Sequence, residues 1–444
     1  MTSARTVILG AGLTGLSAAY HLSPTETVVV ECEQEVGGLC RSRNVDGFVF
    51  DNTGHVLHLR NAGIRDLVLT LLPDTFASIE RKALVYSKGV YTAYPFQANT
   101  HGLPEAVVSE CVLGFLEALR RRESSVGGTA SNLREWILLT FGDGIARHFM
   151  LPYNEKLYRQ DLTTLDGETT SWSIPQPTLQ EVVQGALGSE VRGLGYNPSF
   201  LYPKRGGIDV IPRAFADRCG DLRLGTTVRR IDPVARRAEL DGGDTLEYER
   251  LISTIPLDAL LRMLDPSPDP VLREASSRLR AVRVVNVNLG IDREGVLPGH
   301  WVYFPEPEFP FYRVGSASNF SDGVAPTGCS SLYVEVARRR DEVVDLETLR
   351  VEVVEALRRA RILRASDRIV VHETQILDPA YVVHDHDRQR LLPRIVSVLD
   401  RYGIVSTGRY GAWEYGSMET ALSQGRQAAR RPCDHPTPAV GGMR

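Results

Sequence analysis

The chain has 444 residues, a net charge of -4, a hydrophobic fraction of 43% and a charged fraction of 24%, which are the proportions of an ordinary globular protein. Its acidic balance argues against a nucleic-acid partner, and its apolar runs are too short to cross a membrane. Its length predicts interwoven lobes, because a single core rarely extends over so many residues.

Cysteine and lysine usage indicate where the protein is located and what kind of organism it comes from. The six cysteines have no CxxC or other metal-ligand spacing, and no signal peptide precedes the first predicted strand. We therefore expect reduced thiols, no metal site and a cytoplasmic location. Only four lysines occur among the 51 basic residues, and this preference for arginine is typical of a GC-rich genome and indicates a bacterial source.

The N-terminal segment predicts a β-α-β unit that binds a dinucleotide. An apolar run at Thr6–Gly10 precedes a stretch with helical spacing of apolar residues, and Thr27–Glu31 then has the pattern of a buried parallel strand. Three glycines stand in G-x-G-x-x-G register at the strand-to-helix turn: Gly10, Gly12 and Gly15. Such glycines allow a tight turn and close approach of a pyrophosphate, and Glu31 can accept hydrogen bonds from the adenosine ribose. A simple turn without a ligand is the alternative.

The next elements favour FAD over NAD. Gly37–Ser42 (GGLCRS) resembles the GG-x-x-R-S element of the flavin amine oxidase and UDP-galactopyranose mutase superfamily. There, Arg41 would neutralise the pyrophosphate. Ile252–Pro256 resembles the S-T-x-P turn of the superfamily, and Gly408–Gly411 resembles the late segment that closes over the flavin. No second G-x-G-x-x-G follows a strand, which argues against a built-in NADPH domain.

Other predicted elements follow in chain order. A helical stretch extends from about Pro104 to Gly188, and a later helix from about Leu346 to Arg361 has a solvated, arginine-rich face. Strands are expected at Thr226–Ile231, Arg250–Ile255, Arg283–Ile291, Trp301–Phe304 and Ser331–Val336. His384–Asp387 resembles a metal site in composition, but we expect a solvated loop. The tail after Ala429 is polar and rich in Pro and Gly, which predicts disorder.

Long segments resemble UDP-galactopyranose mutases, specifically the eukaryotic type. They are Gly47–His58, Tyr94–Pro104, Leu133–Tyr158, Asn197–Gly207, Trp301–Arg313 and Gly408–Glu419. The implied fold is α/β, with a Rossmann-like FAD-binding domain interleaved with a helical domain and a mixed or antiparallel-sheet substrate domain. The expected FAD-binding segments are residues 1–95, 200–280 and 400–430. The helical substrate or oligomerisation domain covers 96–199, the sheet-containing substrate domain 281–399, and a flexible tail 431–444.

The resemblance also assigns residues to a site. The cofactor would contact Gly10, Gly12, Gly15, Glu31, Gly38, Arg41, Gly54, His55, Val228, Gly408, Arg409 and Met418. The base and nearby sugar would contact Tyr94, Phe96, Gln97, Asn154, Tyr158 and Asn197, and the diphosphate Tyr303, Arg313, Tyr381 and Tyr415. His55, Arg313 and Arg409 would be the catalytic group, with His55 on a mobile loop beside the flavin. Each aromatic residue and His55 could instead belong to the core.

The implied activity is that of a flavin-dependent mutase that interconverts pyranose and furanose forms of a nucleotide sugar, with N5 of reduced FAD as nucleophile at the anomeric carbon. An external donor, NADPH or a reductase, would reduce the flavin, and a homo-oligomer is possible. Alternatives are an FAD-dependent oxidase or desaturase, and a flavoprotein that only binds.

Two departures from the family pattern leave the sugar and nucleotide open. Trp172–Pro177 lacks the family's loop arginine, and Tyr158 replaces a tryptophan. The sequence therefore predicts that Arg313 is the main cation for the diphosphate, with Arg192, Lys204 and Arg205 as other candidates.

Overall fold

The N-terminal β-α-β prediction is confirmed by the computed structural model, which describes residues 2–124, 130–167, 174–191, 193–194 and 198–431. Strand β1 (Thr2–Leu9) leads through the glycine turn into helix α1 (Leu13–Tyr20) and then into β2 (Thr27–Val30). β1 pairs in parallel with β2 on one side and with β12 (Thr245–Ser253) on the other. The Rossmann-like arrangement therefore forms the centre of the first sheet.

The first sheet has the order β10-β11-β12-β1-β2-β9, with β18 paired to β12. Its remaining strands are β9 (Asp221–Arg223), β10 (Val228–Asp232), β11 (Arg237–Leu240) and β18 (Ile404–Ser406). Alternate β1 side chains enter two different cores, because successive side chains of a strand point to opposite faces. Val7 and Leu9 pack with one layer of helices, and Ile8 packs with another.

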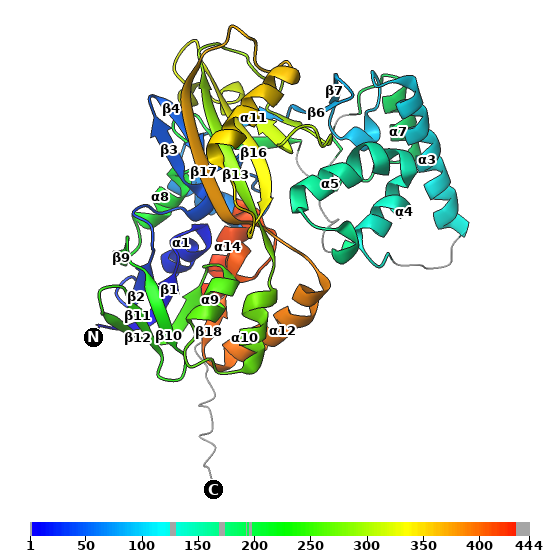
Figure 1. The fold of residues 1–444 in the computed structure, drawn as a ribbon. Helices are drawn as coiled ribbons and strands as arrows, with labels where there is room; N and C mark the ends of the chain where they lie inside the picture. The colour runs from blue at the N-terminus through cyan, green and yellow to red at the C-terminus, as the bar shows by residue number, and fades with distance from the viewer. Residues whose placement is uncertain (1, 125–129, 168–173, 192, 195–197, 432–444) are drawn as a thin grey trace.

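Helices cover both faces of this sheet (Figure 1). One layer contains α1, α8 (Val210–Ala216) and α14 (Met418–Arg430), whose buried side chains share a core with Ile8. The opposite layer contains α9 (Leu257–Met263), α10 (Pro270–Arg278) and α12 (His386–Arg401), which pack against Val7 and Leu9. Strands buried on both faces become nearly continuous apolar runs, and this explains the sequence TVVV of β2.

The second sheet has the order β17-β13-β16-β15-β14-β6-β7. Its strands are β6 (Ala83–Ser87), β7 (Val90–Ala93), β13 (Ala281–Ile291), β14 (Trp301–Tyr303), β15 (Arg313–Gly315), β16 (Ser330–Arg339) and β17 (Ile369–Val382). Helix α11 (Leu346–Arg359) buries Leu349, Val353 and Leu357 in one core with Val285 and Val287 of β13. Asn286 and Asn288 alternate with these valines, so the face away from α11 is polar.

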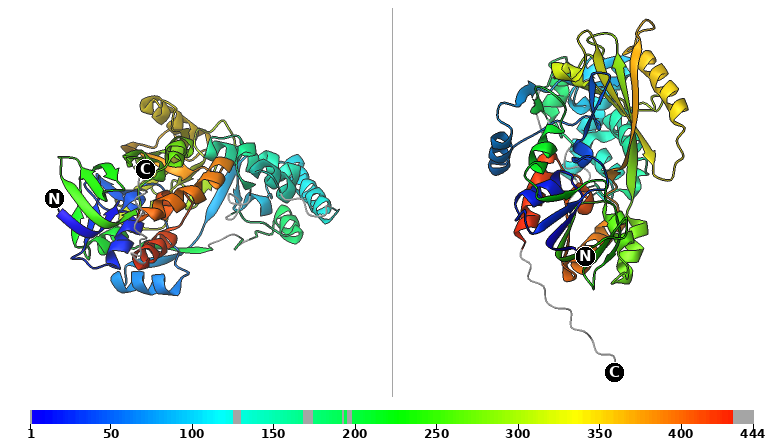
Figure 2. Two further views of the ribbon diagram at one scale, coloured as in Figure 1. Left: turned by 90° about the horizontal axis from the view of Figure 1, so that it is seen from below. Right: turned by 90° about the vertical axis from the view of Figure 1, so that its left-hand side faces the viewer.

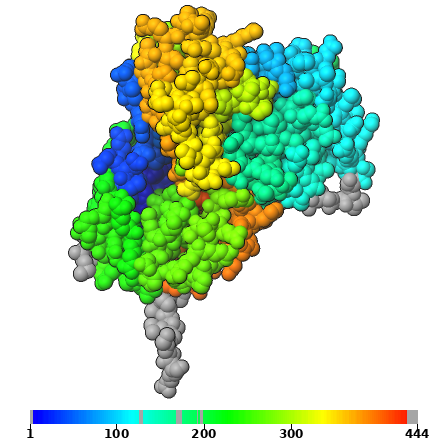
Figure 3. All heavy atoms as spheres, viewed as in Figure 1, coloured from blue at the N-terminus to red at the C-terminus, as the bar shows by residue number. Residues whose placement is uncertain are grey.

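A helical unit lies to one side of the two sheets (Figures 1 and 2). It contains α3 (Glu105–Ser124), α4 (Leu133–Ile145), α5 (Leu151–Tyr158) and α7 (Leu179–Ala186). Its core includes Phe115, Ile137 and Phe141, and it continues into the second sheet through Val282 and Tyr312. The space-filling view shows the atoms of this unit in contact with the body of the protein (Figure 3).

Short elements connect these three parts. They are β3 (Ser42–Val45) paired with β4 (Phe48–Asp51), α2 (Ala62–Leu71), β5 (Phe76–Glu80) paired with β8 (Ser199–Pro203), and α13 (Gly408–Gly411). No helix in the described part of the chain is long and apolar enough to cross a membrane.

The α/β class and the interleaving of a Rossmann-like unit with helical and sheet-containing parts are confirmed. Two stretches nevertheless lie across the boundaries expected from the sequence. β6 and β7 fall within residues 1–95 but pair into the second sheet through β14. α12 falls within residues 281–399 but packs beneath the first sheet. Pairing between segments so distant in sequence leaves no local pattern, so the sequence did not reveal it.

The segment His384–Asp387 differs from the sequence expectation. The prediction of a solvated loop is wrong for Asp385, which is 3% exposed. Its Oδ1 accepts a hydrogen bond from the backbone N–H of Arg388 at 2.7 Å, which caps α12, and its Oδ2 accepts one from Nε of Arg280 at 2.7 Å. The composition of the segment therefore reflects a helix start rather than a metal site.

We predict that Asp385→Ala lowers the free energy of unfolding by about 2–3 kcal/mol, because it removes a helix cap and leaves Arg280 unpaired. Asp385→Asn should lose less, since its amide oxygen can still cap the helix. Urea denaturation measures both variants, with Asp387→Ala as the control at a more exposed position. An Asp385→Ala variant as stable as the parent would contradict this role.

Candidate functional site

The glycine turn between β1 and α1 leaves open space where a dinucleotide is expected. Gly10 has φ +95°, and a Cβ on Gly15 would lie 2.0 Å from the carbonyl oxygen of Gly10. These two glycines are therefore required by the fold itself. Gly12 differs, because a Cβ there would meet nothing closer than the Cα of Gly38 at 4.0 Å. The space in front of Gly12 fits close approach of a phosphate to the N-terminus of α1.

Glu31 follows β2 and lies beside this turn. Its Oε2 accepts a hydrogen bond from the backbone N–H of Ala11 at 2.7 Å, and Oε1 accepts one from that of Glu33 at 3.0 Å. The backbone N–H of Thr226 donates to the carbonyl of Glu31, which brings the start of β10 and the buried Val228 to the same end of the sheet. Glu31 and Val228 thus lie where the sequence expects the adenosine.

Arg41 follows the 3-10 turn that contains Gly38. Its Nε donates to the carbonyl oxygen of Gly38 at 3.1 Å, and its Nη1 lies 3.0 Å from Oε2 of Glu33. Gly38 also approaches Gly12, as described above. Arg41 is thus close to the glycine turn, but its charge is partly compensated by a carboxylate, and its role toward a pyrophosphate stays a prediction.

The late segment returns to the glycine turn as expected. A Cβ on Gly408 would lie 2.8 Å from Oγ1 of Thr14 in α1, and the buried Met418 begins α14, which packs along α1. Arg409 follows Gly408 and donates hydrogen bonds to the carbonyl oxygens of Ala380 (3.0 Å) and Gly416 (3.2 Å). Arg409 is therefore held at the junction of the two sheets.

Tyrosine rings surround Arg409. Its guanidinium carbon lies 4.4 Å from the ring centroid of Tyr415 and 5.5 Å from that of Tyr381. These two rings stack with centroids 6.2 Å apart and planes 3° from parallel. Burial raises the pKa of Tyr158 on α5, as do Tyr381 and Tyr415, which places a third hydroxyl in this group. A tyrosine hydroxyl can donate a hydrogen bond to an anion.

Arg313 has a partner that the sequence did not reveal. Its Nη2 and Nε donate to Oε1 of Glu335 at 2.6 and 3.1 Å, across the β15–β16 pair. Glu335 is fully buried. The expectation that Arg313 is the main cation facing the diphosphate therefore needs correction, because a carboxylate in direct contact compensates its charge. The sequence feature that could have indicated this pair is Glu335 itself, an acidic residue between Val334 and Val336 in a buried strand.

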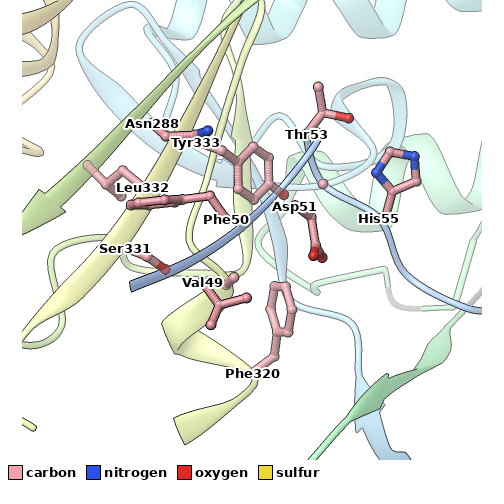
Figure 4. Close-up of a pocket in the computed structure, with 12 residues that line it drawn as sticks. Val49, Phe50, Asp51, Thr53, His55, Asn288, Phe320, Ser331, Leu332 and Tyr333 are labelled. Carbon is pink, nitrogen blue, oxygen red and sulfur yellow. The ribbon is translucent and has the colours of Figure 1, made fainter. Parts of the chain in front are cut away.

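Gly54 and His55 form a loop beside the Arg313–Glu335 pair, where the backbone N–H of Gly54 lies 3.5 Å from Oε1 of Glu335. A Cβ on Gly54 would lie 2.3 Å from the hydroxyl of Tyr333, so the loop passes very close to β16. Figure 4 shows the side chains of His55, Asp51 and Tyr333 around this segment, where they line a pocket. Burial, together with the charges of Arg409 and Arg313, lowers the pKa of His55 to about 4. The imidazole of His55 is therefore neutral at pH 7, and in this form it can donate or accept a hydrogen bond.

The residues expected around the base lie at the edge of the helical unit. Tyr94 and Tyr303 have ring centroids 5.0 Å apart, and the guanidinium of Arg81 lies 5.3 Å from the Tyr94 ring. Gln97 is buried and donates from Nε2 to the carbonyl of Pro175 at 2.7 Å, whereas its Oε1 has no hydrogen-bond partner among the described residues. A free acceptor in this place suits the imide N–H of a base.

Three other assignments have different outcomes. Phe96 is fully buried and stacks on Phe149 at 5.0 Å, as the core alternative predicted. Asn154 is buried and donates from Nδ2 to the carbonyl oxygen of Met150, the residue directly before α5. Asn197 and Arg192 lie outside the described residues, as do Trp172 and Ser173 at the start of the segment that lacks the family's loop arginine.

Sequence reasoning missed Arg81 and Glu335, which lie beside Tyr94 and Arg313. Lys204 and Arg205, the proposed substitutes for the loop arginine, are exposed. No group of three or more His, Cys, Asp or Glu side chains in the described ranges is arranged to hold a metal ion. The site therefore combines a dinucleotide cradle with an adjoining surface of arginines and tyrosines.

Comparison with known proteins identifies the same architecture. The family model of flavin-containing amine oxidoreductases matches residues 13–431. The crystal structure of a reduced UDP-galactopyranose mutase is similar with a TM-score of 0.90 and 27% sequence identity, over 97% of this chain and 93% of the other.

Curated relatives in sequence belong to other activities. Coproporphyrinogen III oxidase of Bacillus subtilis (strain 168) is 23% identical over 381 residues, which cover 77% of this chain and 79% of the relative. The zeta-carotene-forming phytoene desaturase of Myxococcus xanthus is 22% identical over 388 residues, which cover 75% and 72%. The names of these relatives describe an oxidase and a desaturase with different substrates.

We predict that Gly12→Val and Gly15→Val fail in different ways. Gly12 has φ -74° and ψ 176°, which valine can adopt, so Gly12→Val should fold but lose the flavin because its side chain fills the phosphate approach. Gly15→Val should also destabilise the fold, because its Cβ would collide with the Gly10 carbonyl. Flavin absorbance and circular dichroism measure the two effects. A flavin-loaded Gly12→Val protein would contradict the assignment of the cradle.

Proposed function

Because the chain belongs to the flavin-containing amine oxidoreductases and its cofactor is FAD, we propose that it is a mutase. Its reaction would interconvert the pyranose and furanose forms of a nucleotide sugar similar to UDP-galactopyranose. The similarity to a reduced UDP-galactopyranose mutase over nearly the whole chain supports this proposal. So does the chemistry of the surface beside the cofactor cradle.

The observation that carries the proposal is the group formed by Arg409, Tyr381 and Tyr415. A guanidinium in contact with two tyrosine rings offers a permanent charge and several donors, and a diphosphate is an anion with many acceptors. Tyr158 and Tyr303 extend the hydroxyl-lined surface toward Tyr94. An apolar substrate would have little use for such donors, whose desolvation costs free energy unless they are paired.

The described residues fit FAD at the other side of the site. The room in front of Gly12 suits the pyrophosphate, and Glu31 can accept from the ribose. Reduced FAD, when bound, supplies the nucleophile that replaces the nucleoside diphosphate at the anomeric carbon. The protein's own part is to hold the diphosphate with arginine and tyrosine donors, stabilising the charge that develops as it leaves.

His55 has a limited part in this proposal. Its depressed pKa of about 4 keeps it neutral, so it can donate or accept one hydrogen bond without adding a charge beside Arg409 and Arg313. The interconversion is redox-neutral and needs no protein acid–base pair. An external donor, NADPH or a separate reductase, would be required to reduce the flavin, and a homo-oligomer remains an expectation.

The alternative is an FAD-dependent oxidase or desaturase, which the names of the curated relatives favour. Such a reaction transfers electrons from substrate to flavin and requires reoxidation by an acceptor. The two activities therefore differ in which flavin redox state supports turnover, and one experiment separates them.

We predict turnover of UDP-galactopyranose to its furanose isomer only with reduced FAD. Dithionite-reduced and oxidised protein are incubated anaerobically with UDP-galactopyranose and other nucleotide sugars, and chromatography resolves new isomers. Equal conversion by the oxidised protein would contradict the proposal. Substrate-dependent oxygen consumption without any isomer would instead establish the oxidase alternative.

We also predict that Arg313→Ala lowers kcat/KM by roughly one to two orders of magnitude, since a charge-assisted contact is lost and buried Glu335 is left unpaired. The double variant Arg313→Ala/Glu335→Gln should recover part of the loss, because it removes the unpaired carboxylate. FAD content and thermal stability serve as controls. Full recovery in the double variant would mean that Arg313 only neutralises Glu335, and parental activity of Arg313→Ala would exclude any role.

A further inference from the structure

Lys156 extends from α5 into the turn between β14 and β15. Its Nζ donates hydrogen bonds to the carbonyl oxygens of Phe304 at 2.8 Å and Phe311 at 3.2 Å, and to that of Glu306. An ammonium group has three N–H donors, so these three carbonyls use all of them. One side chain thus gathers both ends and the middle of the turn around a single positive charge.

This turn lies between two residues of the candidate site. Tyr303 immediately precedes Phe304, and Arg313 follows the turn as the first residue of β15. The backbone N–H of Phe304 donates to the carbonyl of Tyr312 at 2.9 Å, which closes the base of the turn. Tyr303 and Arg313 are opposite each other in the β14–β15 pair, and residues 304–311 form the turn that joins the two strands at this point.

The helix that carries Lys156 contributes the opposite side of the site. Asn154 and Tyr158 lie two residues before and after Lys156 on α5. This helical unit also contacts the second sheet through apolar side chains, which include Val282 and Tyr312, and Arg159 just after α5 lies 3.6 Å from Glu342 beyond β16. Apolar contacts are non-directional, whereas three hydrogen bonds from one ammonium group define a position.

Among the residues that the structure describes, no carboxylate lies at hydrogen-bonding distance from Nζ of Lys156. Oε1 of the nearby Glu306 accepts instead from Oγ of Ser87 (2.7 Å) and the backbone N–H of Lys88 (2.9 Å). Burial lowers the pKa of Lys156 to about 8, while Glu306 and Glu308 oppose this shift. Removing an ammonium group from water costs free energy, and the three hydrogen bonds to carbonyl oxygens offset this cost only in this position of the side chain.

We propose that Lys156 is a positioning residue for the nucleotide-sugar site, which fixes Tyr303 and Arg313 on the β14–β15 turn relative to Asn154 and Tyr158 on α5. The identity of the ligand rests on the proposed function. The positioning of the turn by Lys156 rests on the three hydrogen bonds of its ammonium group. Lys156 acts through the turn and touches no reacting atom in this scheme.

Two measurements on FAD-loaded protein test the positioning role of Lys156. Hydrogen–deuterium exchange should be about tenfold faster in Lys156→Met at the amides of Phe304 and Tyr312, with the amides of β2 unchanged. Calorimetric titration with UDP should give a Kd raised by about tenfold. Lys156→Arg, which keeps a cation with several donors, should recover part of both effects.

Lys82→Met is the matched control, because Lys82 is exposed and forms no side-chain hydrogen bond or ion pair within the described ranges. It should leave exchange and UDP affinity at parental values. Unchanged exchange in Lys156→Met, or faster exchange with unchanged UDP affinity, overturns the positioning role. If the parent binds neither UDP nor UDP-galactopyranose, the proposed function fails first, and this outcome is distinct from a failure of Lys156 in a parent that does bind them.

Discussion

The close contacts at the β1–α1 turn are the constraint on which the rest of the structure depends. Segments from the start, middle and end of the chain meet there through backbone groups and small side chains. The backbone N–H of Thr254 donates to the carbonyl oxygen of Leu9 at 2.9 Å, that of Thr407 donates to the carbonyl oxygen of Ser253 at 2.9 Å, and Gly408 packs on the side chain of Thr14. Because only backbone and small side chains form this junction, the N-terminus of α1 stays accessible to a phosphate, and the late segment that carries Arg409 is held within reach of the same cofactor.

A second constraint is the row of polar side chains across the second sheet. Gln375, Asn286, Glu335 and Arg313 are paired in register on four neighbouring strands, and Tyr303 continues the row on β14. Because neighbouring residues of one row share a face, this row forms the polar side of a sheet whose other side is covered by α11. The sheet therefore supplies the site with charge and hydroxyl groups, while its apolar face supplies stability.

The sequence predicted the parts of the site that depend on local pattern. Gly12 and Glu31 were predicted from their spacing along the chain, and Gly408 was predicted from a resemblance to the late segment of the superfamily. Arg81 and the pairing of Arg313 with Glu335 were not, because they depend on which strands pair and in which register, and the sequence pattern does not show this. The same reason explains why β6 and β7 were expected with the first sheet. Asp385 was expected in a solvated loop because its partner Arg280 lies 105 residues away in the sequence.

The arginines of the site differ in whether a nearby carboxylate already compensates their charge, and this changes which of them is its main cation. Glu33 lies 3.0 Å from Arg41, and Glu335 lies 2.6 Å from Arg313, so each of these cations already has an anion. Arg409 instead contacts carbonyl oxygens and tyrosine rings, and within the described ranges it forms no ion pair with a carboxylate. An incoming diphosphate would have to share Arg313 with Glu335, whereas Arg409 offers it an uncompensated charge. In the proposed mutase reaction, electrostatic attraction to the leaving group would therefore be centred on Arg409, and Arg313 would contribute direction through a geometry that Glu335 fixes in advance.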